Sequence, residues 1–294
     1  MVALLSFIWG GTFLVTEVAL TGITPFWLAA SRIGFAAIVM TLLWATRGFK
    51  LFETTLTRAQ TSTVLFIGAA SSAIPFALLA WGQQYVTSGF AGVSMASVAL
   101  IVLPLAHFMV PDERITLRKS VGFIVGFCGV VILIGGQAFE STGTTLEMPG
   151  RMACVAAASC YAISSILLRR LPEVDPIGLA TVLLIIGGCI AIPVALIVEG
   201  WPPLPSPKIL MVLAFLGLVP TAAANLLRVL VVRSAGPVFM SLVNYQVPVW
   251  SVVLGALILS EPLPPSLLYA MALILAGVAL SQFGTLKRMF KAHR

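Results

Sequence analysis

Charged side chains are scarce in this sequence. The 294 residues include only 10 Asp and Glu and 17 Lys and Arg, so 9% are charged, whereas 60% are hydrophobic. A soluble domain carries about 25% charged residues, and no soluble fold of this length has enough interior to bury so much apolar surface. The composition therefore predicts an all-α integral membrane protein, since a membrane β-barrel would show alternating segments of about ten residues.

Metal-binding, redox and nucleotide-binding patterns are also missing. The four cysteines all lie within apolar runs without a CxxC pair, and the two histidines, His107 and His293, stand alone. This pattern argues against a disulfide framework and against a zinc site. The sequence has no G-x-x-x-x-G-K-[ST] loop for phosphates, and GVSMA at 92–96 does not match the G-x-S-x-G serine motif. We therefore predict no metal, no cofactor, no ATP drive and no enzymatic activity.

What the sequence does contain is a series of long apolar runs. A helix that crosses the hydrocarbon core needs about 20 mostly apolar residues. Ten runs qualify, at residues 2–20, 25–46, 62–84, 88–110, 119–137, 150–168, 176–198, 208–232, 236–259 and 265–285. The first run has no basic start and no A-x-A cleavage site, so we expect it to be a retained helix and not a signal peptide.

The positions of the basic residues predict the orientation. With the N-terminus in the cytoplasm, 14 of the 17 basic residues fall on the cytoplasmic side. Only Arg151 and Lys208 fall outside, and Arg32 lies within a helix. Short cytoplasmic loops are enriched in Lys and Arg, so the net charge of +7 is read as a topology signal and not as nucleic-acid binding. Both termini are predicted to be cytoplasmic, with anionic lipid contacts as a by-product.

The two halves of the chain resemble each other. The matched positions, first half to second half, are Gly89 and Gly236, Glu113 and Glu261, Gly122 and Ala270, Gly129 and Gly277, Trp9 and Tyr161, and Pro25 and Pro176. Each half carries five apolar runs, and an odd number makes the second half enter from the opposite side. Inverted repeats are typical of secondary transporters, with the substrate site at the midplane. We predict two repeats, 1–137 and 150–294, around a central cavity in one transmembrane domain.

Several motifs carry a family resemblance. They are WGGTF at 9–13, Pro25 followed by Arg32, Ser88-Gly89-Phe90-Ala91 followed by Asp112-Glu113-Arg114, and Ser234-Ala235-Gly236-Pro237 followed by Ser260-Glu261. With these motifs the whole chain resembles the drug/metabolite transporter superfamily of EamA type, and within it the bacterial exporters of aromatic amino acids. The resemblance implies a ten-helix carrier of the bacterial inner membrane. One departure is Pro248 in the ninth run, where the first half has a displaced Pro104, so the two gates are expected to be unequal.

The stretch SLVNYQVPVWSVVLG at 241–255 carries polar residues deep in an apolar run. Polar groups at this depth persist where they face the bundle interior or a watered cavity, although amides also join neighbouring helices. We interpret the stretch as a cavity wall and assign to it four candidate substrate-binding residues, Asn244, Tyr245, Gln246 and Trp250. Pro248 in this run, and Pro220 beside Thr221 in the eighth, are predicted hinges of bent helices that line the cavity.

Other runs offer aromatic and small polar residues for the same cavity. The candidates are Trp9, Phe13, Trp81, Tyr85, Ser94, Tyr161 and Asn225. Core packing would use Trp9 and Phe13 equally well, and an interfacial aromatic belt would explain Trp81 and Tyr85. A lining of rings, amides and hydroxyls with almost no fixed charge suits a neutral or zwitterionic solute with a flat apolar part.

Three charged residues within or beside the spans, Glu17, Arg32 and Glu261, are candidates for an ion pair or for proton coupling. Glu17 and Glu261 are both expected toward the outer side, so either could pair with Arg32. Recognition of a substrate carboxylate is the second interpretation of this arginine, and snorkelling of its side chain to the membrane interface is the third. Glu17 is the only acid placed for proton coupling. We expect coupling to be weak and the protein to act as a facilitator or exchanger.

The sequence as a whole predicts a secondary transporter that exports aromatic and other amino acids by alternating access. Export of planar drugs or other metabolites is the alternative, and a channel or an intramembrane enzyme belongs to a different class. The expected partners are a small-molecule substrate and the lipid bilayer. The protein is expected to be a monomer or a homodimer, with the glycines at 122, 126 and 129 as a packing face or dimer seam.

Overall fold

The computed structural model describes residues 2–52, 55–109, 115–135, 145–202, 204–227 and 243–292. Within these ranges almost every residue outside short turns is helical, and the described residues hold no β-strand beyond an isolated bridge between Phe52 and Val174. The all-α fold class predicted from composition is confirmed.

The helices follow the predicted runs closely. In the first half they are α1 (Val2–Leu20), α2 (Pro25–Ala45), α3 (Arg58–Gly68), α4 (Ile74–Gly82), α5 (Ser88–Met95), α6 (Ser97–Met109) and α7 (Leu117–Gly135). In the second half they are α8 (Glu147–Arg169), α9 (Pro176–Glu199), α10 (Pro207–Gly217), α12 (Val243–Leu259) and α13 (Pro265–Ala292). Two π-helical segments complete them, η1 (Ala69–Ala73) between α3 and α4, and η3 (Leu218–Ala223) after α10.

Length and composition make these helices membrane spans. Among the described residues, eight helical segments are long and apolar enough to cross a bilayer, and two shorter apolar helices cover Gln246–Leu259 and Pro265–Ser281. Large apolar side chains also point outward, with Ile197 83%, Leu257 77% and Ile38 62% exposed. Such a surface is compatible with lipid and not with water, so the chain is a multi-pass membrane protein.

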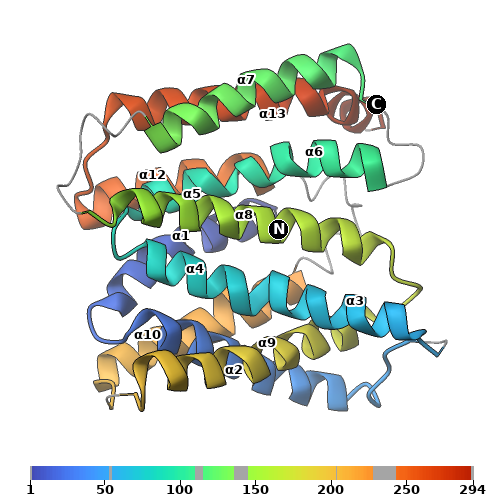
Figure 1. The fold of residues 1–294 in the computed structure, drawn as a ribbon, viewed down its shortest axis with the longest axis vertical. Helices are drawn as coiled ribbons and strands as arrows, with labels where there is room; N and C mark the ends of the chain where they lie inside the picture. The colour runs from blue at the N-terminus through green and yellow to red at the C-terminus, as the bar shows by residue number, and fades with distance from the viewer. Residues whose placement is uncertain are drawn as a thin grey trace.

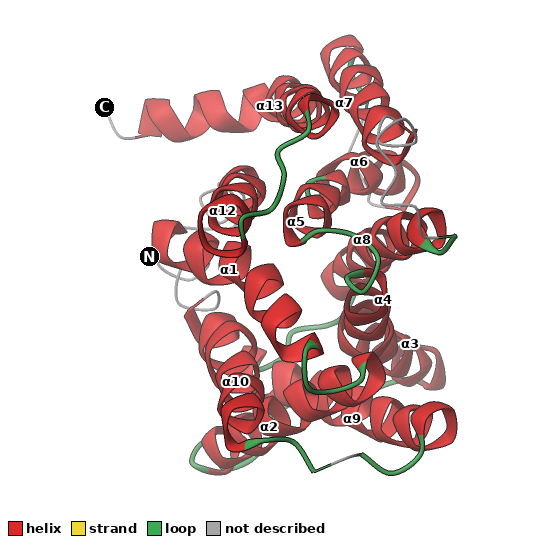
Figure 2. Cartoon of the chain, turned by 90° about the vertical axis from the view of Figure 1, so that its left-hand side faces the viewer, coloured by secondary structure: helices red, strands yellow, loops and turns green. Residues whose placement is uncertain are grey.

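The helices stack in layers, with α7 and α13 at one edge and α2 and α9 at the other (Figures 1 and 2). The packing is reciprocal between the halves. The first helix of the first half, α1, packs on α12, while the first helix of the second half, α8, packs on α5 and α6. Likewise α1 contacts α10, and α8 contacts α4. This exchange of equivalent contacts is the packing expected of two related five-span units.

The two π segments also occupy equivalent places, in the third span of each half. A π turn shifts the backbone bonding from i→i+4 to i→i+5 and often marks a functional site. Pro75 is the second residue after η1, and Pro220 lies inside η3. Because proline lacks an N–H, carbonyl groups near these positions are open to side-chain donors.

The α7–α13 edge is held by glycine. A Cβ on Gly277 would lie 2.4 Å from the Gly126 nitrogen, and one on Gly122 would lie 2.6 Å from the Gly277 oxygen. The two backbones therefore touch, as small residues permit in membrane helices. The packing face predicted at residues 122–129 is present, but α13 of the same chain covers it, so the alternative of a dimer seam on this face is wrong.

Loops also join the halves at the end where α2 and α8 finish. The Asp175 backbone nitrogen donates to the Leu51 oxygen at 2.8 Å, and Arg47 lies 3.7 Å from the Asp175 carboxylate. Asp175 also caps α9 through the Ile177 and Gly178 nitrogens. One carboxylate thus fixes the start of α9 and the loop after α2.

Candidate functional site

A buried arginine lies where spans of both halves meet. Arg32 of α2 is only 8% exposed. Its Nε donates to the Thr221 hydroxyl of η3 at 2.8 Å, and its guanidinium carbon lies 4.1 Å from the centre of the Phe76 ring of α4. The cation is therefore held by one neutral hydrogen bond and one aromatic face.

The π segment η3 is fixed by its neighbours. The Thr221 hydroxyl donates to the Leu216 oxygen at 2.9 Å, five residues back, as the π turn allows. The Asn225 amide donates to the Thr221 oxygen at 2.6 Å, and the Trp9 indole donates to the Pro220 oxygen at 3.1 Å. Hence Trp9 of the first predicted run meets Pro220 and Asn225 of the eighth, next to the Thr221 that binds Arg32.

Tyr161 of α8 completes this group. It is in electrostatic range of Arg32, and it packs with Trp9 against the largest apolar core. We call Trp9, Arg32, Phe76, Tyr161, Thr221 and Asn225 the central cluster. It draws on α1, α2, α4, α8 and the η3 region, so it contains residues of both halves.

The predicted pairing of Arg32 with Glu17 or Glu261 is wrong. Glu261 instead accepts the Ser88 and Gly89 nitrogens at 2.8 and 3.0 Å, where it caps α5. Within the described residues Arg32 makes no ion pair, and its terminal nitrogens make no hydrogen bond. The sequence could not show this, because Glu261 is bound at the start of α5 and Arg32 reaches Thr221, contacts that depend on how the helices cross.

An arginine in this setting favours an anionic ligand. Burying a charge without a partner costs several kcal/mol, and a desolvated cation–π contact returns about 2 kcal/mol. A carboxylate offers the guanidinium two parallel charge-assisted hydrogen bonds. The central cluster is therefore suited to bind a carboxylate next to aromatic rings.

The predicted residues of the ninth span lie apart from Arg32, as far as they are described. Trp250 packs edge-to-face on Phe7 with ring centroids 5.2 Å apart, and a Cβ on Gly10 would meet the Trp250 Cβ at 2.5 Å. These contacts put Trp250 at the α1–α12 interface. Pro248 is buried within α12, and Gln246 is half-buried. The side chains of Asn244 and Tyr245 lie outside the described residues.

Phe13 and Ser94 form ordinary packing contacts. Phe13 is buried in the main core, and its carbonyl accepts the Gln83 amide at 2.8 Å. Ser94 is completely buried and donates to the Ala91 oxygen of its own helix at 2.7 Å. Phe13 thus acts through its ring alone, and the Ser94 hydroxyl is bound within its own helix.

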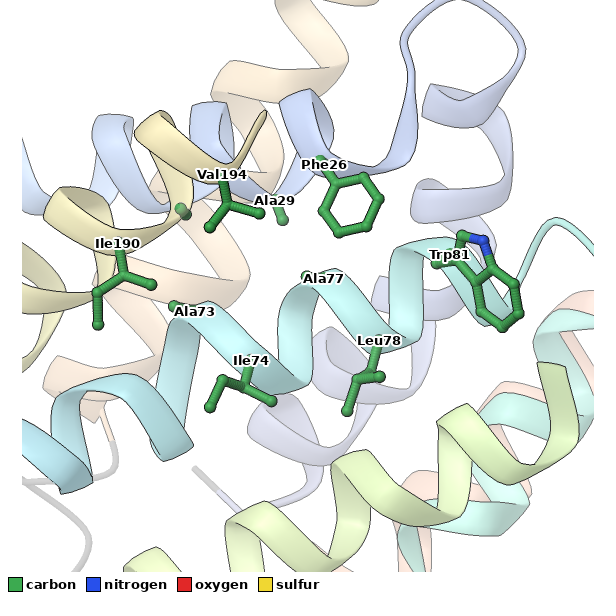
Figure 3. A pocket seen from close by; sticks show the side chains of 10 residues that line it. Phe26, Ala29, Ala73, Ile74, Ala77, Leu78, Trp81, Ile190 and Val194 are labelled. Atoms are coloured by element: carbon green, nitrogen blue, oxygen red, sulfur yellow. The ribbon is translucent and has the colours of Figure 1, made fainter. Parts of the chain in front are cut away.

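Trp81 and Tyr85 form an edge-to-face pair, with centroids 5.1 Å apart. Trp81 also lines a pocket of about 370 Å³ between α2, α4 and α9 (Figure 3). Its other lining residues are Phe26, Ala29, Ala73, Ile74, Ala77, Leu78, Ile190, Ala191 and Val194. Since these side chains are all apolar, this pocket is suited to an apolar group.

A second acid binds across the halves and was not singled out from the sequence. Glu199, the last residue of α9, accepts the Phe26 and Trp27 nitrogens at 3.1 Å each and the Thr24 hydroxyl at the start of α2. Glu261 does the same for α5. Both acids come from the second half and cap helices of the first, at the end where α1, α9 and α12 finish.

Two members of the central cluster, Phe76 and Thr221, were not among the predicted binding residues. Phe76 is one of 17 phenylalanines in a chain of apolar runs, so nothing in the sequence distinguishes it. Thr221 carried a signal, because it interrupts an apolar run beside Pro220.

Comparison with known proteins agrees with the fold. A family model described as the EamA-like transporter family matches residues 1–135 and 148–283. The S-adenosylmethionine/S-adenosylhomocysteine transporter of Chlamydia muridarum is 25% identical over 303 residues, which cover 95% of this chain and 90% of that protein. The uncharacterized transporter YoaV of Bacillus subtilis is 21% identical over 278 residues, which cover 94% and 93%.

A crystal structure of a protein with 20% sequence identity superimposes with a TM-score of 0.67 over 97% of this chain and 96% of the other. This likeness shows a shared fold. The two matches of the family model together span almost the whole sequence, one in each half. The chain therefore belongs to the EamA-like transporter family.

Proposed function

We propose that this protein is a secondary transporter that carries metabolites with an α-amino-carboxylate head group and a planar ring. Aromatic amino acids are the first candidates, and export across the bacterial inner membrane is the proposed direction. Family membership supports transport, and the central cluster supports the substrate class.

The observation that carries the substrate class is that Arg32 makes no ion pair with any residue that the structure describes. A zwitterion with a carboxylate would neutralise the buried guanidinium when it binds and would remove most of the cost of its burial. The Phe76 ring lies against the guanidinium. Trp9 is bound to the Pro220 oxygen, next to the Thr221 that Arg32 binds, and Tyr161 interacts with Arg32 electrostatically. They offer ring faces for stacking of the planar part.

S-adenosylmethionine and S-adenosylhomocysteine are the second candidates. A relative that aligns with 95% of this chain is named as a transporter of these two compounds. Both carry the same α-amino-carboxylate head group, and their planar part is a purine in place of a benzene or indole ring. Planar drugs without a carboxylate remain the alternative that Arg32 disfavours.

We propose that transport occurs by alternating access between the repeats 1–137 and 150–294, with both termini in the cytoplasm and Pro220 and Pro248 as hinges. Contacts of Arg32 in α2 with η3, and of Glu199 and Glu261 with α2 and α5, link the two halves. A relative motion of the halves would therefore change the central cluster. The active unit is proposed to be a monomer or a homodimer.

Counterflow in proteoliposomes tests this proposal. Liposomes preloaded with L-phenylalanine or L-tryptophan should accumulate the labelled amino acid with saturation, which a channel would not show. Arg32→Gln removes a charge-assisted hydrogen bond worth about 1.5–3 kcal/mol, so KM should rise about tenfold or more. Arg58→Gln, at an exposed position at the start of α3, is the matched control and should leave KM unchanged.

Competitors separate the candidates. Phenylalaninamide keeps the ring and the amino group but lacks the carboxylate, so it should compete poorly in the wild type. Stronger competition by S-adenosylhomocysteine than by phenylalanine would favour the second candidate. An unchanged KM in Arg32→Gln protein that elutes as a monodisperse peak, or equal competition by the amide, would refute carboxylate recognition.

A further inference from the structure

Glu17 has a buried oxygen that receives no hydrogen bond from the residues that the structure describes. It lies on α1, one turn after Phe13, and its Oε2 is buried without a hydrogen-bond partner. Its polar neighbour is the Gln83 amide, whose nitrogen donates to the Phe13 oxygen at 2.8 Å. The Gln83 amide has two N–H donors and also hydrogen-bonds the Glu17 carboxylate, so Oε2 is the Glu17 oxygen left without a donor among the described residues.

The charged group that acts electrostatically on Glu17 has the same sign as Glu17 itself. Glu261 is its electrostatic neighbour, and both Glu261 oxygens accept backbone nitrogens of α5, from Ser88 at 2.8 Å and Gly89 at 3.0 Å. A Glu261 carboxylate has no proton to donate to Glu17, and two neighbouring anions repel each other. This corner of the molecule lies where α1, α5 and α12 pack together (Figure 2).

A second unsatisfied group adjoins the same carboxylate. Ser88 is completely buried, and its hydroxyl has no partner. A Cβ built on Gly255 would lie 2.5 Å from the Glu261 Oε2 and 2.8 Å from the Ser88 Oγ, so these two oxygens face one point. Among the described residues, the Glu17 Oε2 and the Ser88 Oγ therefore lack hydrogen-bond partners. Both interact with or lie near the Glu261 carboxylate, whose oxygens are bound to backbone nitrogens of α5.

No other charge in the described packing neutralises Glu17. Of the elements that pack on α1, neither α5 nor η3 has a titratable side chain, α2 has only Arg32, which is bound to Thr221, and α10 has only the exposed Lys208 in its first turn. The Tyr245 side chain of α12 lies outside the described residues. Glu17 therefore has Glu261 as its charged neighbour.

We propose that Glu17 binds a coupling proton, which it holds while the Glu261 cap on α5 is closed and releases when that end of the bundle opens. The proposal rests on the transport function proposed above. A carboxyl group that carries a proton has no charge to desolvate, and its O–H can donate to a neighbouring oxygen. When α5 separates from α12, water reaches both acids and the proton can leave.

Proton binding to Glu17 and closure of the α5–α12 end are coupled, and the direction of the coupling can be stated. If the closed end binds one proton more than the open end, acidification favours the closed state, by at most about tenfold in the equilibrium constant per pH unit. Opening of the opposite end of the bundle does not depend on the protonation of Glu17. Exposure of the α5–α12 contact should therefore fall as the pH is lowered.

A thiol-accessibility experiment tests this without a substrate. In a background with the four native cysteines replaced by alanine, Gly89→Cys is introduced in the full-length protein in liposomes, since a Cβ there meets other atoms at 3.4 Å or more. Labelling by a membrane-impermeant maleimide is measured against pH. Each rate is divided by that of Leu204→Cys, which is 99% exposed at the same end, to remove the pH dependence of the reagent.

The normalised rate should fall on acidification by up to about tenfold per pH unit. It should lose this dependence in Glu17→Gln, and keep it in Glu17→Asp and in Glu173→Gln, whose side chain is exposed at the other end. An unchanged pH dependence in Glu17→Gln overturns the proposal. So does a rate that responds to a sodium gradient and not to pH.

A transport arm separates this proposal from the proposed function. In counterflow of L-phenylalanine, wild type and Glu173→Gln should respond to an imposed pH gradient, whereas Glu17→Gln should exchange substrate without responding to it. Absence of counterflow in all variants, with pH-dependent labelling intact, refutes the substrate class and leaves the proton site standing. Counterflow that responds to the pH gradient equally in Glu17→Gln refutes the proton site alone.

Discussion

Single side chains fix the irregular backbone of the eighth span. The indole N–H of Trp9, its only side-chain donor, is bound to the Pro220 oxygen inside η3. This hydrogen bond holds the π-helical segment in place. Trp81, in contrast, uses its ring to line an apolar pocket. Two tryptophans that looked alike as binding candidates therefore differ in what their removal should do.

Trp9→Phe keeps an aromatic ring and removes the hydrogen bond. We expect the free energy of unfolding to fall by about 1 kcal/mol beyond the change from lost ring area, because the Pro220 oxygen is left without its donor. Reversible unfolding in mixed micelles would measure this. Trp81→Phe, which breaks no described hydrogen bond, is the control, and an equal loss in the control would contradict this role for Trp9.

Residue identity alone did not reveal the partners of the central cluster. The sequence pointed to Arg32, Trp9, Tyr161 and Asn225 because polar and aromatic groups at membrane depth are unusual. It could not assign Arg32 to Thr221, since that contact depends on how α2 crosses η3. Which residues are special was thus predictable, and how they pair was not.

At the scale of helices, backbone contact decides the tightest packing. The crossing of α7 and α13 leaves no space for even one methyl group at Gly277. Gly34 on α2 is the opposite case, because a Cβ there would have no neighbour within 4 Å. The chain therefore has a matched pair of helical glycines, one with a packing role and one without.

Gly277→Ala should separate the two helices, since backbone atoms cannot move aside as a flexible side chain can. Overpacking of this kind costs about 1–3 kcal/mol, which thermal unfolding of the purified protein would detect. Gly34→Ala should leave stability unchanged or raise it slightly, because alanine is the better helix former. A Gly277→Ala protein as stable as wild type would mean that the seam is looser than the structure indicates.

Helix bounds were predictable wherever apolar runs are bordered by proline or charge. The run 25–46 became α2 at Pro25–Ala45, and the run 176–198 became α9 at Pro176–Glu199. The π segments were not predicted, because composition does not distinguish i→i+5 from i→i+4 bonding. Their only sequence signals are Pro75 beside η1 and Pro220 inside η3.

At the scale of the whole molecule, the orientation in the membrane remains a prediction from the basic residues. It places the end with Trp201 and Leu204 outside and the end with Leu117 in the cytoplasm. Leu204 and Leu117 are 99% and 84% exposed, so a cysteine at either position is open to reagent. In a cysteine-free background, Leu204→Cys should react with an impermeant maleimide on intact cells, whereas Leu117→Cys should react only after lysis. The reverse result would invert the topology.

The spacing of matched residues predicted the division into two halves, and reciprocal packing of α1 on α12 and of α8 on α5 and α6 is what such a division implies. A central cavity shared by Tyr161, Asn225 and Asn244 remains a prediction, since the Asn244 side chain lies outside the described residues. The spacing of matched residues in a sequence is enough to predict a repeated architecture. The same spacing does not predict the size of a central cavity, because that size depends on every side chain that lines it.

The glycine contact of α7 with α13 also bears on how the molecule can move. These two helices are the last spans of the two halves, and they lie at one edge of the stack (Figure 1). Their backbones are so close at Gly277 that the helices would have to separate before one could slide along the other. This edge is therefore the natural pivot. The widest excursions of a rocking motion would then fall on the far side, at α2 and α9, where Glu199 fastens one of these helices to the other.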